Sequence, residues 1–234
     1  MGNYVGLHDI MEELDREGIA GMQWIAVVTM LIDHIGIVWF PDSPLWRIVG
    51  RLAFPIYTYF IALGMTRTRS LPNYVRRLTV LALLSQAPFA LLFDTWTVNV
   101  IGTFAVSVGA LVLMERMPRS NPLRYAWPVA AALLMEAVSF DYGAYGLLLL
   151  VLYRYTQSHT TVLGHLALNG LYLILYATPL QLFSILPTLA FAYAPGLSAW
   201  SRAPVPRWLW RFFYPVHLTV LLILVEISRR NMLH

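Results

Sequence analysis

Nine long apolar runs recur along the chain, and short polar segments separate them. The runs fall at 21–41, 45–65, 77–93, 98–114, 126–140, 143–157, 161–177, 179–194 and 209–228. Most approach the roughly 20 residues that a helix needs to cross a bilayer. They are continuous rather than alternating, and in lipid only helices or closed barrels satisfy the backbone. The pattern therefore predicts an all-α, polytopic integral membrane bundle of about eight to ten transmembrane helices.

Composition supports a membrane protein and removes several kinds of chemistry. Of the 234 residues, 59% are hydrophobic and only 12% are charged, with a mean hydropathy of +0.63. A soluble domain usually carries about a quarter charged residues. We expect a single transmembrane domain over 21–234, after a short cytoplasmic or interfacial segment at 1–20. Cysteine and lysine do not occur, which excludes disulfides, thiolate nucleophiles and lysine Schiff bases.

The arginines gather in three of the connecting segments and predict an orientation. These segments are "TRTRSLPNYVRR", "ERMPRSNPLRYA" and "SRAPVPRWLWR". Cationic loops stay in the cytoplasm, so we expect a multi-pass protein of the cytoplasmic membrane with its N-terminus in the cytoplasm. The same topology explains the net charge of +4 without a nucleic-acid partner. Nine spans would place the C-terminus outside, against the preference of Arg229 and Arg230, so 179–194 is a candidate for a re-entrant segment and the side stays open.

An ionisable pair, Asp33–His34, interrupts the first apolar run. It lies about 18 Å into the predicted helix at about 1.5 Å per residue, near the middle of the bilayer. Ionisable groups at this depth are costly and usually functional. Neighbouring residues are about 100° apart on a helix, so the two side chains cannot form a simple dyad. A structural pair that pins two helices is the alternative.

Two arginines on one helix face follow in "LWRIVGRLAFP". Arg47 and Arg51 are four residues apart, Gly50 permits close helix approach, and Pro55 should bend or open the helix. This face suits an anion, which is either an acidic side chain (Asp33 or Asp141) or a phosphate or carboxylate ligand. The sequence leaves both readings open.

Other polar residues lie near the ends of later runs. In "SFDYGAYG", an aromatic belt explains Tyr142 and Tyr145. It does not explain Asp141 together with the two glycines, Gly143 and Gly146. His217 follows Pro215, so a structural and a functional role are equally open. We expect mainly helix–helix hydrogen bonds from the remaining residues, which are Gln86, Asn99, Glu136, His165 and Asn169. The histidines are scattered without metal-site spacing, and no metal is expected.

Taken in order, "QWIAVVTMLIDHIG", "RIVGRLAFPIYTYFIALG", "LLSQAPF", "DYGAYG" and "YPVHL" resemble the TraX family of bacterial membrane proteins. The resemblance runs from about Gln23 to Leu218. It implies kinship with transmembrane acyltransferases, which use cytoplasmic acyl-CoA; the family is named for a protein that acetylates the N-terminus of F-pilin. In that superfamily a first-span histidine is thought essential, which corresponds to His34. The acceptor, an amine or hydroxyl of a pilin-like peptide or an envelope glycan, does not follow from the fold.

The residues and the resemblance together predict an acetyl-CoA-dependent acetyltransferase. His34 would act as general base and Asp33 would hold the site's geometry, although an acyl-histidine intermediate is a variant. The expected substrate- and cofactor-binding residues are Arg47, Arg51, Asp141, Tyr142, Tyr145, His217, Arg76 and Arg77, with Arg67 and Arg69 as further phosphate ligands. Two alternatives stay open, a transporter or channel and a non-enzymatic accessory protein of a pilus or secretion system.

Overall fold

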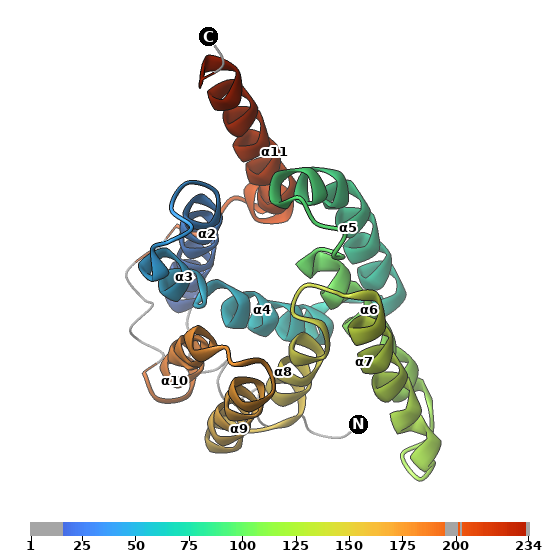
Figure 1. The fold of residues 1–234 in the computed structure, drawn as a ribbon. Helices are drawn as coiled ribbons and strands as arrows, with labels where there is room; N and C mark the ends of the chain where they lie inside the picture. Colours follow the sequence, from blue (N-terminus) through green and yellow to red (C-terminus); the bar gives the residue numbers. More distant parts are fainter. Residues whose placement is uncertain (1–15, 195–200, 202, 233–234) are drawn as a thin grey trace. The chain divides into compact units, whose positions relative to one another are not determined.

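The computed structural model describes residues 16–194, 201 and 203–232 (Figure 1). Its helices are α2 (Arg16–Trp39), α3 (Pro44–Gly50), α4 (Ala53–Arg67), α5 (Leu71–Phe93), α6 (Val100–Arg116), α7 (Ala126–Val138), α8 (Gly143–Tyr155), α9 (Ser158–Tyr176), α10 (Ile185–Tyr193) and α11 (Arg207–Met232). Two 3₁₀ segments, η1 (Pro122–Tyr125) and η2 (Pro179–Ser184), precede α7 and α10. Each apolar run folds as helix, so the all-α prediction is confirmed.

Among the described residues, four helical stretches are long and apolar enough to cross a bilayer. They are Gly18–Trp39, Pro44–Arg67, Leu71–Phe93 and Arg207–Asn231. The remaining runs fold as shorter or less apolar helices. The segment at 179–194, expected as a weak or re-entrant span, consists of η2 and the nine-residue α10, which is too short to cross a bilayer by itself.

The second apolar run is broken near its start. Its helix stops at Gly50 and resumes at Ala53, so that α3 and α4 replace one continuous span. Pro55 lies in the first turn of α4, where its missing N–H disturbs no helical hydrogen bond. The expected local opening of this helix is therefore present, and it lies just before the proline.

The chain divides into two compact units. Unit 1 comprises Met1–Leu63 and Leu149–Arg211, and unit 2 comprises Gly64–Leu148 and Phe212–His234, as far as these residues are described. In unit 1, α3 packs on α2 and on η2, and α9 packs on α10 and η2 (Figure 1). In unit 2, α6 packs against both α5 and α7, and most of its residues are buried.

Hydrogen bonds join the two loops at one end of unit 2. The N–H of Val98 donates to the Ser139 carbonyl (3.1 Å), and the Asp141 N–H donates to the Val98 carbonyl (2.8 Å). Asn99 caps α6 and also donates to Gln86 Oε1 on α5 (2.7 Å). These contacts satisfy polar groups inside apolar surroundings, as expected of Gln86 and Asn99.

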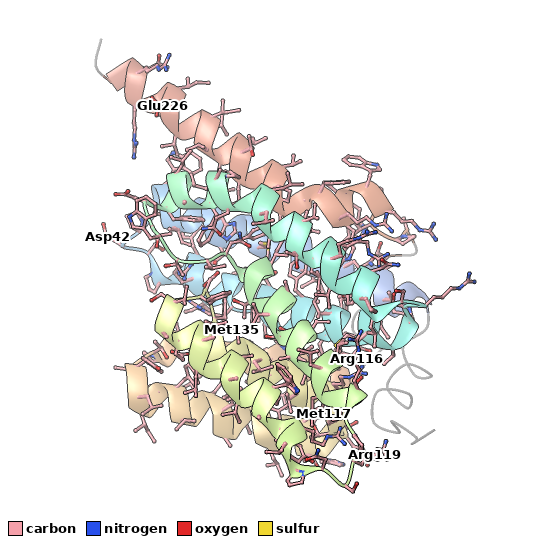
Figure 2. The ribbon with its side chains drawn as sticks, turned by 90° about the vertical axis from the view of Figure 1, so that its right-hand side faces the viewer. Asp42, Arg116, Met117, Arg119, Met135 and Glu226 are labelled. Atoms are coloured by element: carbon pink, nitrogen blue, oxygen red, sulfur yellow. The ribbon has the colours of Figure 1, made fainter. Side chains whose placement is uncertain are left out.

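The opposite end of unit 2 is rich in arginine. There α5 begins, α6 ends and α7 begins, because the short connections make neighbouring helices antiparallel. Figure 2 shows Arg116 and Arg119 beside the α6–α7 connection, while Met135 lies farther along α7. This end also carries Arg76, Arg77 and Arg124. Apart from Arg229 and Arg230 in the last turn of α11, the arginines of unit 2 thus gather at one end, a distribution that the positive-inside rule produces.

Candidate functional site

Two glycines allow α2 and α3 to approach closely. A Cβ on Gly36 would collide with Trp46 of α3, and a Cβ on Gly50 would collide with the carboxylate of Asp33 on α2. Each helix therefore places a side chain over a glycine of the other. This reciprocal contact explains in physical terms why glycines follow "IDHI" and "RIV" in the sequence.

Asp33 forms an ion pair with Arg47 across this contact. Arg47 Nη1 lies 2.7 Å from Asp33 Oδ1, and the two side chains are 28% and 15% exposed. The second arginine, Arg51, also interacts electrostatically with Asp33. Of the two readings left open for the arginine face, the protein contains the Asp33 pair, and a ligand-binding role remains a prediction.

Arg51 has a further partner, which the sequence did not indicate. Its Nη1 donates to Oε1 of Gln181 at 3.1 Å. Gln181 lies in η2, 130 residues away in sequence, and is 7% exposed. Arg51 follows α3 directly, and α3 packs on η2. This packing brings the Arg51 and Gln181 side chains together. We name Asp33, Arg47, Arg51 and Gln181 the Asp33 cluster.

His34 lies next to this cluster on α2. The side chain is buried, with 9% exposed, and it points about 100° around the helix from Asp33. The Asp33 carboxylate faces α3, where Arg47 and Gly50 contact it. The arrangement therefore keeps Asp33 engaged with α3 while His34 faces a different direction, and the base role of His34 stays a prediction.

A second histidine in unit 1 belongs to a neutral hydrogen-bonded cluster. His165 Nδ1 lies 2.7 Å from Thr188 Oγ1, and its Nε2 lies 3.1 Å from Ser184 Oγ. Asn169 Nδ2 donates to the same Ser184 oxygen at 3.1 Å, and the Tyr153 hydroxyl lies 2.6 Å from Thr188 Oγ1. These five residues, the His165 cluster, join α8, α9, η2 and α10, which fits the helix-linking role expected for His165 and Asn169.

In unit 2, the Asp141 turn is held mainly through its backbone. The Asp141 carbonyl accepts a hydrogen bond from Thr103 Oγ1, and its N–H is bonded to Val98. Tyr142 and Gly143 both have positive φ angles, 63° and 37°. Glycine adopts such angles without steric cost, which explains the glycine at position 143. Glu136 Oε1 accepts from the Ala144 N–H at 2.9 Å and so caps the start of α8.

Tyr142 and Tyr145 lie at this turn, and Tyr214 lies on α11 in unit 2. Tyr142 and Tyr145 are neighbouring rings, with centroids 6.1 Å apart. The ring of Tyr214 on α11 meets that of His217 edge-on, with centroids 5.7 Å apart. His217 Nδ1 lies 2.6 Å from the Phe213 carbonyl. Since a carbonyl only accepts, Nδ1 carries a proton there.

The remaining expected binding residues, Arg76 and Arg77, are exposed on the first turns of α5. The Arg77 guanidinium lies 5.6 Å from the centre of the Tyr74 ring. Of the expected residues, Asp33, His34, Arg47 and Arg51 thus belong to unit 1. Those of unit 2 are Asp141, Tyr142, Tyr145, His217, Arg76 and Arg77. In the described ranges, no three His, Asp or Glu side chains are grouped so as to hold a metal ion.

Comparison with known proteins adds the family. The chain is 28% identical over 235 aligned positions to the probable fimbrial assembly protein FimC, serogroup H1, of Dichelobacter nodosus, covering 84% of this chain and 91% of that protein. It is 29% identical over 138 positions to protein TraX of Escherichia coli, covering 56% of this chain and 53% of that one. No solved structure matches significantly. The family model described as "TraX protein" matches residues 19–225, and this all-helical membrane protein therefore belongs to the TraX family.

Proposed function

We propose that the protein is a membrane acetyltransferase, which moves an acetyl group from acetyl-CoA to an amine or hydroxyl acceptor. The observation that carries this proposal is a buried histidine, His34, beside a carboxylate that Arg47 fixes within an apolar helix pair. Such an arrangement is costly in a membrane. It is understandable where a histidine must be held in one place to accept and return a proton.

The proposed reaction needs one base and no resident cofactor. His34 removes a proton from the acceptor as the acceptor's nitrogen or oxygen forms a bond to the thioester carbon. The carbonyl oxygen becomes an oxyanion, the C–S bond then breaks, and the CoA thiolate takes the proton from His34. Asp33 has a positioning role, because its carboxylate pairs with Arg47 on α3. A variant in which His34 carries the acetyl group transiently gives the same products.

We further propose separate binding roles for residues of unit 2. Arg76 and Arg77, exposed where the arginines gather, have the charge needed for the phosphates of CoA. Asp141, with Tyr142 and Tyr145 beside it and His217 on α11, has the acidic and aromatic character to bind an amine acceptor. The Dichelobacter relative is described as a probable fimbrial assembly protein, and a pilin-like acceptor would suit a role in fimbriae.

The direct test is acetyl transfer by the purified protein in lipid nanodiscs. Radiolabelled acetyl-CoA and an envelope extract from the host bacterium are added, and label is followed into protein and glycan fractions. We expect transfer by the wild type and at least a hundredfold loss in His34→Ala, because general base catalysis contributes about 10²–10⁴-fold. Transport of a solute without transfer would favour the transporter instead. Neither binding nor consumption of acetyl-CoA would favour an accessory role.

A further inference from the structure

The side-chain amide of Gln181 has one polar atom that forms a hydrogen bond and one that does not. Its Oε1 accepts the hydrogen bond from Arg51. Its Nε2 is buried and has no hydrogen-bond partner among the described residues. The side chain as a whole is 7% exposed, so bulk water does not satisfy the amide nitrogen either.

Chemistry fixes the orientation of this amide. The two ends of a glutamine amide are assigned from their hydrogen-bond partners. A guanidinium group can only donate, so the oxygen of Gln181 must face Arg51 and the nitrogen must face away from that bond. The unused donor therefore belongs to the native arrangement and lies beside the point where Arg51 reaches η2.

An unused buried donor is unfavourable, so a residue without it would serve Arg51 better. A buried polar group with no partner costs about 1–3 kcal/mol. Glutamate has the same length and would accept from Arg51 more strongly, because its carboxylate is charged. The contrast with Gln86 is informative, since that amide uses both ends, with Nε2 donating to the Thr97 carbonyl (2.9 Å) and Oε1 accepting from Asn99.

We propose that Gln181 Nε2 binds the acyl carbonyl oxygen of the acetyl donor and its oxyanion in the transition state. This inference rests on the proposed acetyl transfer, and it adds η2 to the site. The amide belongs to the Asp33 cluster, and Asp33 directly precedes His34. A donor shielded from water is most effective towards an oxygen that gains negative charge during the reaction. Because Nε2 is buried, this binding requires a local shift of η2 that lets the acyl oxygen reach the donor inside unit 1.

The test compares two glutamine-to-glutamate substitutions. Gln181→Glu keeps an acceptor for Arg51 and removes the amide donor, whereas Gln86→Glu makes the same change in a fully bonded amide of α5. Acetyl transfer and melting temperature are measured for both in nanodiscs. We expect kcat/KM to fall about 10²–10³-fold in Gln181→Glu, as for loss of one oxyanion donor. The melting temperature should not fall and should rise somewhat, because the unused donor is gone and the charged acceptor binds Arg51 more strongly. Gln86→Glu should melt earlier and keep kcat/KM within about twofold, because it loses a structural hydrogen bond.

A second measurement does not depend on the glutamate variant, which could fail because the new carboxyl group is protonated or because the protein misfolds. Infrared difference spectra of bound acetyl-CoA, labelled with ¹³C at the acetyl carbonyl, report hydrogen bonding to that oxygen directly. We expect the carbonyl band of the wild-type complex to lie at lower frequency than in the Gln181→Met complex, because Met has no donor.

The outcomes separate this inference from the proposed function. Wild-type rates in Gln181→Glu, or identical carbonyl bands in wild type and Gln181→Met, would overturn the inference and leave acetyl transfer intact. A wild-type protein that neither binds nor consumes acetyl-CoA would overturn both. A role for Gln181 limited to holding Arg51 predicts an active Glu variant and an inactive Met variant with an unshifted carbonyl band.

Discussion

Two polar clusters of unit 1, the His165 cluster and the Asp33 cluster beside His34, show opposite designs. In the His165 cluster, both ring nitrogens have hydroxyl partners at 2.7 and 3.1 Å, and His165 is fully buried. The Asp33 cluster instead combines one carboxylate with two guanidinium groups, remains partly exposed, and leaves the Gln181 nitrogen unused. A cluster that is neutral and fully bonded serves helix packing. Charged groups and an unused donor would suit a substrate site. The burial of a polar cluster therefore does not by itself distinguish a structural role from a functional one.

The largest expected effect is the loss of activity on removing His34. In His34→Ala, acetyl transfer should fall about 10²–10⁴-fold, because the general base is gone. The melting temperature should change little, since the Asp33–Arg47 pair on α2 and α3 stays in place. Transfer assays and thermal unfolding on the same nanodisc preparation measure both effects. A His34→Ala protein with wild-type transfer would assign the chemistry elsewhere.

A methyl group on Gly50 should damage the geometry of the Asp33 cluster. In Gly50→Ala the new Cβ collides with the Asp33 carboxylate, so that carboxylate or α3 must move. We expect a loss of about 1–3 kcal/mol in unfolding free energy from overpacking. Transfer should fall about 10²-fold, as when reacting groups shift by about 1 Å. Normal kcat/KM in this variant would mean that Asp33 has no positioning role.

The sequence predicted the helices and the Asp33–His34 pair, but it did not predict which residues complete the Asp33 cluster. Continuous apolar runs located each helix, because lipid demands internally bonded backbone. The spacing of Arg47 and Arg51 suggested one shared partner. Arg47 does pair with Asp33, but Arg51 also donates to Gln181, a partner that the spacing did not indicate. Gln181 carried no local signal, since its role depends on a contact 130 residues away in sequence. Locally, Gln181 is one of several polar residues in a largely apolar run, two positions after Pro179.

The coupling between Asp33 and Arg47 can be measured directly. A double-mutant cycle of Asp33→Asn, Arg47→Gln and the double variant isolates their interaction from other effects. For a pair that is 15% and 28% exposed, we expect a coupling of about 1–2 kcal/mol in unfolding free energy. Transfer should fall in all three variants. A coupling near zero would show that Gly50 packing, rather than the ion pair, orients Asp33.

The His165 cluster should show the reverse pattern. Thr188→Val conserves shape but removes the hydroxyl that meets both His165 and Tyr153. We expect a loss of about 1–2 kcal/mol in stability, with kcat/KM within about twofold of wild type once the protein is folded. The contrast between the clusters would fail if this substitution lowered transfer as strongly as the changes at the Asp33 cluster.

The smallest effect is expected at Gly170, which is the matched control for Gly50. Both glycines lie in helices of unit 1, but a Cβ on Gly170 meets nothing within 4 Å. Alanine lowers the conformational entropy of the unfolded chain and favours helix, so Gly170→Ala should add about 0.5–1 kcal/mol of stability. Transfer should be unchanged. If Gly170→Ala impaired transfer as much as Gly50→Ala, the Gly50 effect would reflect a general loss of helix flexibility, and contact with Asp33 would no longer explain it.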